Sequence, residues 1–193
     1  MSDTLQLTFR EEARPEDCAR VRAVVESTGF FYPEELDIAE ELVRERLEKG
    51  PVSGYHFIFA DAEAGDGTSG RNAELLGYAC HGPSDADPTL FDLYWIAVRQ
   101  GCRGSGLGAD ILRRTEERVR DMGGKLLVAE TSGRELYAPT RRFYERHGFF
   151  EAERVKDFYR PGDDKVVYHK LLGHEPLGRK EMKAGNVPHP PHP

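Results

Sequence analysis

Cysteine is scarce in this chain of 193 residues, and the three that occur, Cys18, Cys80 and Cys102, lie far apart with no CxxC pair. This pattern excludes a disulfide framework and a zinc site built from clustered cysteines, and we predict no bound metal. Free thiols are typical of a reducing compartment, so the sequence predicts a cytoplasmic protein.

Long apolar runs and an excess of basic residues are missing as well. No apolar stretch approaches the length that spans a membrane, and the opening MSDTLQLTFREEARPED has no signal-peptide pattern. The chain holds 27 Lys and Arg against 34 Asp and Glu, a formal net charge of −7. Binding to nucleic acid or to an anionic membrane needs a basic face, so we expect neither partner. A cationic substrate such as an amine remains compatible with this charge.

Hydrophobic patterning predicts strands and helices that alternate within one domain. Strands are predicted at 4–13, 55–63, 73–82, 90–98, 125–131, 149–159 and 164–172, and helices at 14–29, 33–50, 109–123 and 137–148. Short loops join the early strands, which should be antiparallel, whereas a helix links strands 90–98 and 125–131, which should be parallel. The predicted fold class is α/β (α+β), a single mixed, mostly antiparallel sheet of about seven strands flanked by four helices, with one central parallel pair.

Two segments are predicted to lie outside this packed structure. Residues 64–72, AGDGTSGRN, form a flexible hairpin loop in this prediction. Residues 173–193 lose all periodicity and end in PHPPHP, which is typical of extended polyproline-like chain. The domain is therefore expected to span residues 1–172, followed by a tail containing proline and histidine.

The segment RQGCRGSGLG, residues 99–108, holds four glycines and two arginines between a predicted strand and a predicted helix. Glycines let backbone N–H groups turn toward a ligand, and the helix N-terminus adds the positive end of its dipole. This combination binds anions such as phosphate groups.

Two familiar phosphate-binding patterns do not match this segment well. A triphosphate loop of the GxxxxGK type fails because Leu107 stands where the lysine must be. A dinucleotide fingerprint, GxGxxA, runs from Gly104 to Ala109, with Glu130 about twenty residues on as a ribose-binding carboxylate. Five residues separate Val98 from Gly104, however, whereas the first glycine of that motif follows its strand almost directly.

The third pattern, RxxGxG from Arg103, resembles the acetyl-coenzyme A loop of the GNAT N-acetyltransferase superfamily. WIAVRQGCRGSGLGADIL (95–112) is similar to its signature strand, loop and helix, and TRRFYERHGF (140–149) to its second signature. RVKDFYRPGDDKVVYHKLL (154–172) resembles its closing hairpin. The resemblance covers about residues 4–172 in element order and implies a GNAT-like acetyltransferase domain with acetyl-coenzyme A as co-substrate.

The resemblance also implies cofactor contacts along the strand end, the loop and the helix start, namely Ile96, Ala97, Val98, Arg103, Gly104, Ser105, Gly106, Leu107, Gly108 and Ala109. Tyr137 stands where the family often has an asparagine that contacts the pantetheine arm, and we count it among these contacts. Arg99, Arg113 and Arg114 are expected to add positive charge nearby, although a solvated helix face explains Arg113 and Arg114 equally well.

The implied reaction moves an acetyl group from a thioester to a primary amine by direct attack. Tyr144 stands at the position of the family's tyrosine acid, which implies that it protonates the departing thiolate; otherwise it is a core aromatic with its hydroxyl at the surface. Glu130, at the end of strand 125–131, is the candidate general base, or equally a carboxylate that caps the following TSG.

Strand 90–98 carries two further polar side chains, Asp92 and Tyr94, ahead of the glycine segment. Alternation places these two on one face of the strand and Leu93 and Trp95 on the other.

The acceptor is indicated only in outline. The segment between the first two helices borders the acceptor site in this superfamily, and here it is rich in acid, with Glu34, Glu35 and Glu41 as a candidate rim for a cationic amine. A solvated helix face explains the same charges. GFFYPEE (29–35) either walls the acceptor pocket or plugs the core.

DFY (157–159) resembles the part of peptide-acetylating members that touches the acceptor. A small-molecule amine and a protein or peptide amine both remain open as partners, and a homodimer is allowed. The rival interpretation is a non-catalytic acyl-coenzyme A-binding sensor or assembly module.

Overall fold

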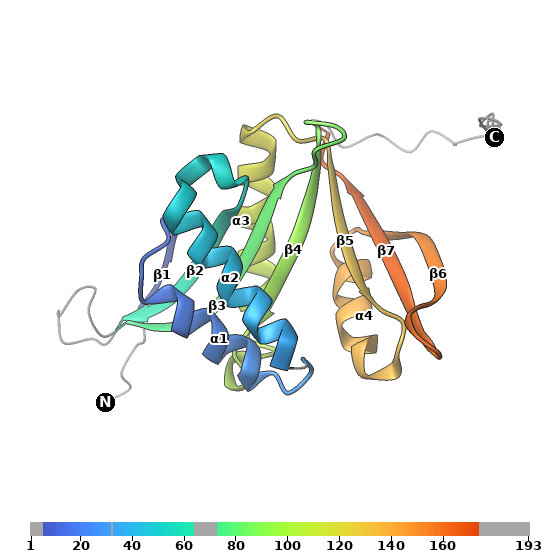
Figure 1. Cartoon of the computed structure of the whole chain (residues 1–193), viewed down its shortest axis with the longest axis horizontal. Coiled ribbons are helices and arrows are strands. Elements are labelled where there is room, and N and C mark those ends of the chain that lie inside the picture. Colours follow the sequence, from blue (N-terminus) through green and yellow to red (C-terminus); the bar gives the residue numbers. More distant parts are fainter. Residues whose placement is uncertain (1–5, 32, 64–72, 174–193) are drawn as a thin grey trace.

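The computed structural model describes residues 6–31, 33–63 and 73–173 of the chain. Within these ranges seven strands form one sheet in the order β1-β2-β3-β4-β5-β7-β6, as Figure 1 shows. The strands are β1 (Gln6–Arg10), β2 (His56–Glu63), β3 (Glu74–Pro83), β4 (Leu90–Val98), β5 (Leu126–Ser132), β6 (Phe150–Arg160) and β7 (Asp163–Leu171). The α-helices are α1 (Asp17–Ser27), α2 (Pro33–Lys49), α3 (Leu107–Asp121) and α4 (Ala138–Arg146). The predicted fold class is confirmed.

The parallel pair at the centre of the sheet is confirmed too. Strand β4 pairs with β5 in parallel only from Leu90 with Leu126 to Leu93 with Ala129. Every other neighbouring pair of strands is antiparallel in the described chain. Beyond Leu93 and Ala129 the two strands no longer pair, so the sheet opens at its middle toward the carboxyl ends of β4 and β5.

Two hydrophobic cores hold the layers together, one on each face of the sheet. Helices α1 and α2 lie in front of the sheet in Figure 1, and α3 lies behind it. Val21, Val25 and Val43 bury the apolar stripes of α1 and α2 against one face. On the other face, Ile111 and Val119 of α3 join a core that also holds side chains of α4 and β7.

A β-bulge in β4 changes which way its side chains point. Cys80 of β3 pairs with Trp95, but His81 pairs with Leu93, so Tyr94 is an extra residue in the ladder. Leu93 consequently packs into the core under α3, whereas Trp95 packs on the side of α1 and α2. The expectation that Leu93 and Trp95 share a face is wrong, because the extra residue inverts the alternation.

Helix boundaries differ from the predicted ones at two places that matter for function. The helix after the glycine segment begins at Leu107, earlier than the predicted residue 109. Tyr137 does not belong to α4 but ends a short 3₁₀ turn, η3 (Glu135–Tyr137). Pro139 lies in the first turn of α4, where its missing N–H costs nothing, so the helix starts after Tyr137.

Two expectations fall outside the described residues: the flexible loop at 64–72 and nearly all of the tail that follows residue 173. None of the helices in the described ranges has the length and apolar character needed to cross a bilayer.

Candidate active site

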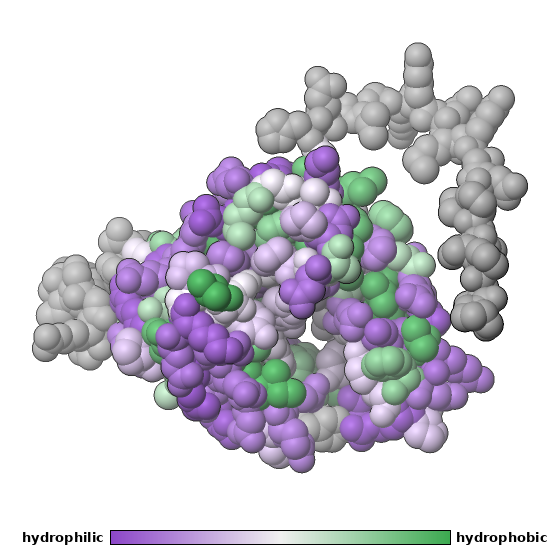
Figure 2. Space-filling view, turned by 45° about the horizontal axis from the view of Figure 1, so that its top comes forward, coloured by the Kyte–Doolittle hydropathy of each residue, from purple (hydrophilic) through white to green (hydrophobic). Residues whose placement is uncertain are grey.

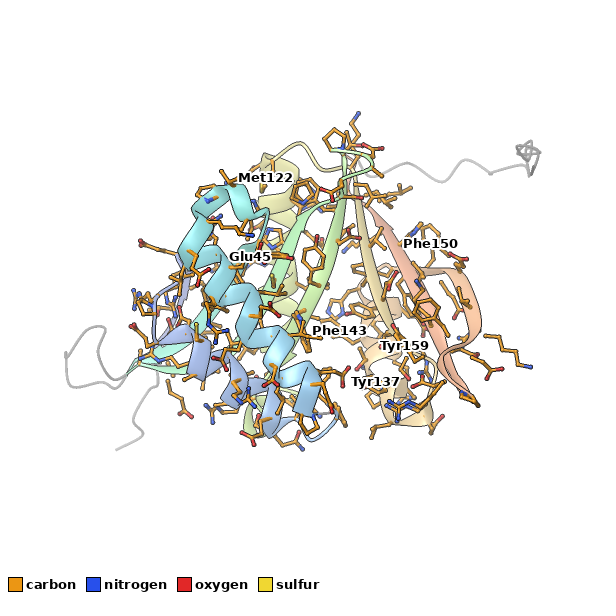
Figure 3. All side chains as sticks on the ribbon, viewed as in Figure 1. Glu45, Met122, Tyr137, Phe143, Phe150 and Tyr159 are labelled. Atoms are coloured by element: carbon orange, nitrogen blue, oxygen red, sulfur yellow. The ribbon has the colours of Figure 1, made fainter. Side chains whose placement is uncertain are left out.

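A cleft of about 1110 Å³ fills the opening between β4 and β5. Its walls come from the α1–α2 connection, β4, the glycine segment, β5, η3 with α4, and the β6–β7 hairpin. Figure 2 shows the molecule hollowed between its two halves, with hydrophobic residues among hydrophilic ones around the opening. In Figure 3 the labelled side chains of Phe143, Tyr137 and Tyr159 gather at this opening.

The glycine segment forms one end of the cleft with its backbone. Gly104 and Gly106 adopt φ angles of 79° and 90°, which only glycine reaches without strain. The Ser105 hydroxyl donates to the carbonyl of Cys102 at 2.7 Å and tightens the turn. Within the described chain no intrachain hydrogen bond takes up the N–H groups of Gly104, Ser105, Gly106, Gly108 and Ala109. These donors, with the N-terminus of α3, suit a phosphate-bearing ligand.

Arg103 is the arginine of the segment that faces this end of the cleft. Its guanidinium lies over the Phe30 ring, with Cζ 4.4 Å from the ring centroid. No carboxylate in the described ranges pairs with it. Partial burial lowers the pKa of Arg103, which still leaves it cationic at neutral pH. An unpaired cation beside free N–H groups is what an anionic ligand requires.

The other arginines expected to add charge at this end of the cleft are engaged elsewhere, and for Arg113, whose side chain is 53% exposed, the alternative of a solvated helix face fits. Arg99 Nε lies 3.2 Å from a Glu74 carboxylate oxygen. Arg113 pairs along α3 with Glu117, and Arg114 stacks over Phe9 on β1. None of these three arginines lines the cleft.

Most of the residues implied as cofactor contacts line the cleft, namely Ile96, Ala97, Val98, Arg103, Gly104, Gly106, Gly108, Ala109 and Tyr137. Two do not. Leu107 is buried in the core under the sheet, and the side chain of Ser105 is used within the turn. Phe143, Arg146 and His147 of α4 and its end line the cleft as well. Arg146 and His147 lie three and four residues after Phe143, the spacing of one helix face, so a stripe that starts at Phe143 was the signal that could have found them.

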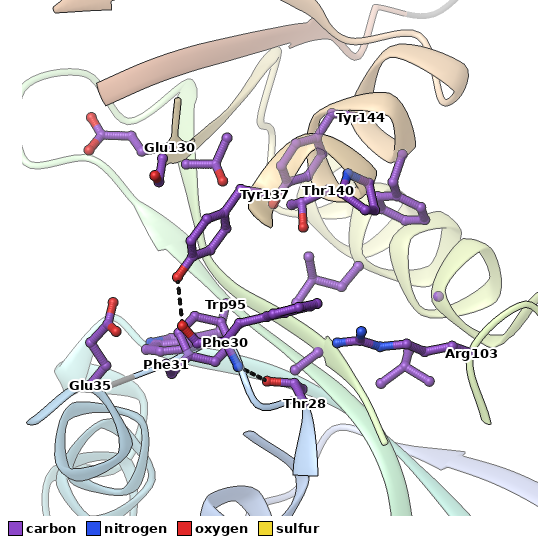
Figure 4. Close-up of a pocket in the computed structure, with 18 of the residues that line it drawn as sticks. Thr28, Phe30, Phe31, Glu35, Trp95, Arg103, Glu130, Tyr137, Thr140 and Tyr144 are labelled. Carbon is purple, nitrogen blue, oxygen red and sulfur yellow. Dashed lines mark hydrogen bonds between the residues drawn. The ribbon is translucent and has the colours of Figure 1, made fainter. Parts of the chain in front are cut away.

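Tyr144 reaches the cleft from α4 and is only 4% exposed. Its ring packs against Phe143, Phe149 and Tyr168. Burial raises the pKa of Tyr144 well above its ordinary value, so the hydroxyl keeps its proton at neutral pH. In the part of the chain that the structure describes, no hydrogen bond takes up this hydroxyl, and the ring is turned into the cleft in Figure 4. A protonated, unpartnered phenol is a suitable proton donor.

Glu130 lines the cleft from the end of β5, with half of its side chain exposed. Its Oε1 lies 3.2 Å from Lys165 Nζ on β7. Glu130 does not cap residues 131–133, where the Ser132 hydroxyl accepts a hydrogen bond from the Arg134 N–H instead. Asp92 does not line the cleft. Burial, and then the charge of Glu130, raise the pKa of Asp92.

The far end of the cleft is aromatic and acidic. Tyr94, Trp95 and Tyr159 line it, and burial raises the pKa of Tyr94 and of Tyr159 to about 12. Glu34 and Glu35, in the first turn of α2, also line it. Glu41 does not line the cleft, so it is not part of the rim.

The β6–β7 hairpin and β5 build a buried polar cluster at the same end. Asp163 accepts a hydrogen bond from the Ser132 hydroxyl at 2.5 Å and pairs with Arg134 at 3.1 Å. Arg141 donates to the carbonyls of Ser132 and Arg134, so it lies under the cleft wall rather than on it. No group of three or more His, Cys, Asp or Glu suited to a metal ion occurs in the described ranges.

Comparison with known families and structures agrees with this geometry. The family model described as acetyltransferase (GNAT) domain matches residues 53–151. A crystal structure from Desulfovibrio desulfuricans, assigned to the GNAT family of acetyltransferases, is 49% identical with a TM-score of 0.80. It covers 87% of this chain and 100% of that one.

Two more distant relatives are also similar. Aminoglycoside 6′-N-acetyltransferase complexed with coenzyme A is 17% identical, with a TM-score of 0.67 over 89% of this chain and 99% of that one, which shows the same fold. Mycothiol acetyltransferase of Rhodococcus erythropolis is 26% identical over 148 residues, or 74% of this chain. The chain spans 46% of the length of that relative.

Proposed function

Since the chain belongs to the GNAT family of acetyltransferases, we propose that it transfers the acetyl group of acetyl-coenzyme A to a primary amine by direct attack. The observation that carries the proposal is the set of chemical groups that line one cleft. Within the described ranges, a protonated phenol without a hydrogen-bond partner, an accessible carboxylate and a row of N–H groups without acceptors all line it. An acyl transfer of this kind needs an acid, a base and an anchor for the acyl carrier.

The glycine segment is the anchor in this proposal. Its N–H groups and Arg103 bind the pyrophosphate of coenzyme A, which brings the thioester as the acyl donor. Ile96, Ala97 and Val98 of β4 guide the pantetheine arm, because β4 still pairs with β3 there but no longer with β5, which leaves the backbone groups on the β5 side for the ligand. Phe143 of α4 forms the opposite wall.

Tyr144 and Glu130 divide the proton transfers in this proposal. The acceptor amine is cationic in water and must lose a proton before it attacks. Glu130 takes that proton, directly or through a water molecule. After the attack, Tyr144 donates its proton to the coenzyme A sulfur as the bond from sulfur to the acetyl carbon breaks, and the second proton that the acylated nitrogen loses restores the phenol through water. The two side chains line the same cleft from different elements, β5 and α4, so one can serve the nitrogen and the other the sulfur.

The acceptor in this proposal is a cationic amine. Glu34, Glu35 and Glu130 attract positive charge to the far end of the cleft, and the faces of Tyr94, Trp95 and Tyr159 favour cations as well. The catalytic domain is taken as residues 1–172. The cytoplasmic setting predicted from free cysteines belongs to the same proposal, and all three cysteines are free in the structure.

Two measurements on the purified chain test the proposal. Calorimetric titration with coenzyme A, acetyl-coenzyme A and NAD should show binding of the first two and none of NAD. A panel of primary amines with acetyl-coenzyme A should then release free thiol and yield acetylated amine by mass spectrometry. Binding without any transfer across the panel would favour the rival function, a non-catalytic acyl-coenzyme A sensor, and binding of NAD alone would contradict both.

A further inference from the structure

Tyr137 crosses the cleft and joins its two walls. Its hydroxyl donates to the backbone carbonyl of Phe30 at 3.1 Å, between residues 107 positions apart in the sequence. Figure 4 shows the ring hanging from η3 and reaching the α1–α2 connection. The side chain is 7% exposed, and burial raises the pKa of Tyr137, so the hydroxyl keeps the proton that it donates.

The acceptor of this bond is held in place by its own turn. Gly29 adopts φ 70°, a conformation that favours glycine, and directs the chain back toward the cleft. The Thr28 hydroxyl accepts a hydrogen bond from the Phe30 N–H at 3.4 Å and donates to the Val25 carbonyl at 2.7 Å. Tyr137 therefore meets a fixed carbonyl.

Aromatic contacts extend the crossing into a partition. Phe31 packs on Trp95 of β4, with ring centroids 5.0 Å apart, and on Tyr137 at 6.3 Å. The guanidinium of Arg134 covers the Tyr137 ring at 5.3 Å. The contacts form a closed circuit. It runs from β4 through Trp95, Phe31 and Tyr137 to η3, and it returns along β5 to the end of the parallel β4–β5 ladder at residues 93 and 129. One cleft is lined by Arg103 on one side of this circuit and by Glu130 on the other, so the cleft passes through the circuit at an opening that we call the window.

The chemical groups of the proposed reaction lie on opposite sides of Tyr137. Figure 4 shows Tyr144, Thr140 and Arg103 on one side of its ring and Glu130 and Glu35 on the other. The proposed acid and the cofactor anchor therefore share one side, and the proposed base and the acidic end of the cleft share the other. An amine that enters from the acidic side must reach the thioester through the window.

We propose that the window selects acceptors by width, with Tyr137 as the residue that sets the limit, so that the acceptor amine is carried on a slender, unbranched chain. This inference rests on the proposed function and narrows its substrate class. A rigid opening discriminates by shape because a wider group must break the Tyr137–Phe30 hydrogen bond and displace packed rings. A flexible cationic chain passes without that cost.

Competition between amines of different width tests the inference. Hexylamine, cyclohexylmethylamine and adamantylmethylamine share a CH₂–NH₂ group of similar basicity and differ in the width behind it. Two amines in one reaction at saturating acetyl-coenzyme A give the ratio of their kcat/KM values from the ratio of products. That ratio is independent of the active enzyme concentration and of any change in cofactor binding.

Wild-type protein should prefer hexylamine over adamantylmethylamine by about tenfold or more. Tyr137→Ala should reduce this preference by about tenfold, and Tyr137→Phe, which keeps the ring but frees it from Phe30, should fall between. Leu136→Ala is the matched control, because Leu136 is the exposed neighbour in η3 and does not line the cleft; it should keep the wild-type ratio. The correctly folded Tyr137→Phe keeps the test valid if the alanine variant unfolds.

An unchanged ratio in both Tyr137 variants, with active protein, would overturn the window and leave the proposed function standing. A wild-type protein that acetylates all three amines equally would overturn it as well. Acetylation of none of the three by wild-type protein would count against amine acetylation itself, which separates the two failures.

Discussion

The guanidinium of Arg103 lies over the ring of Phe30, with Cζ 4.4 Å from the ring centroid, and so joins the glycine segment to the α1–α2 connection. Among the described residues this cation has no carboxylate partner, and the contact holds it beside N–H groups that make no hydrogen bond there. Phe30 also supplies the carbonyl that binds Tyr137. The proposed cofactor anchor and the proposed acceptor wall therefore share one residue.

Replacement of Arg103 by methionine should weaken coenzyme A binding. The variant loses a charge-assisted hydrogen bond to a phosphate. Because the Arg103 side chain is exposed, we expect the affinity to fall by the lower end of the range for such bonds, about tenfold in Kd. Calorimetric titration with coenzyme A measures it. Arg99→Met is the control, because Arg99 is paired with Glu74 outside the cleft. Equal losses in the two variants would show a general effect of net charge.

Enlarging Gly108 should block the cleft without straining the backbone. A Cβ at this position would lie 3.4 Å from the Phe143 ring, an ordinary contact, and the residue is not left-handed. Gly108→Ala should thus keep its affinity for coenzyme A, whereas Gly108→Leu should fill the space between α3 and α4 and abolish binding. Gly106 is a poorer choice, because its φ of 90° strains any branched replacement. If folded Gly108→Leu still bound coenzyme A, the space between α3 and α4 would not be part of the cofactor-binding site.

Neutralising the acidic rim should affect the amine and spare the cofactor. The double variant Glu34→Gln with Glu35→Gln should raise KM for a cationic amine and flatten its dependence on salt, because the attraction is electrostatic. KM for acetyl-coenzyme A should stay as in wild type. Glu41→Gln, on the same helix but outside the cleft, serves as control. Changes in KM for both substrates would show that these carboxylates belong to a solvated helix face and have no specific role in binding the amine.

His81 should make the fold sensitive to mild acid. It is fully buried beside the bulge in β4, and burial, then the charges of His56 and Arg118, lower the pKa of His81 from 6.5 to about 3. Neither ring nitrogen has a hydrogen-bond partner in the described chain. The folded state keeps this histidine neutral while the unfolded chain takes up a proton, so its stabilising effect is complete above pH 6.5 and is lost as pH falls toward 3.

The free energy of unfolding of wild-type protein should therefore fall by about 2 kcal/mol from this group between about pH 7 and pH 5. Urea denaturation at the two pH values measures the change. His81→Phe, of similar size and without a titrating group, should show a fall smaller by that amount. The same fall in both proteins would assign the acid sensitivity to other groups.

Features encoded locally were predictable from the sequence. Strand and helix order, the parallel pair at 90–98 and 125–131, and the glycine turn each follow from patterns within about ten to thirty residues. The bulge at Tyr94 was not predictable, because one extra residue in a ladder leaves no mark in the alternation of a single strand. The partner of Tyr137 was not predictable either, because a backbone carbonyl 107 residues away has no sequence signature.

The positions of the arginine side chains around the glycine segment were the other feature that the sequence did not predict. Arg99, Arg113 and Arg114 stand near the glycine segment in sequence, but strand and helix directions carry them to Glu74, Glu117 and Phe9. The role of Tyr144 stays a prediction that the geometry supports. Its burial, its aromatic neighbours and the lack of a partner for its hydroxyl in the described chain depend on the tertiary structure, so the sequence pattern of α4 alone could not predict them.

The most direct test of the proposed acid catalysis by Tyr144 is the turnover of Tyr144→Phe at saturating acetyl-coenzyme A and amine. The change removes one unpartnered hydroxyl, so the free energy of unfolding should change by less than about 1 kcal/mol and coenzyme A should bind nearly as in wild type. Loss of a general acid should lower kcat by about 10²–10⁴-fold. A folded variant that binds coenzyme A and keeps most of its kcat would contradict this mechanism, because the thiolate would then leave without a proton from Tyr144.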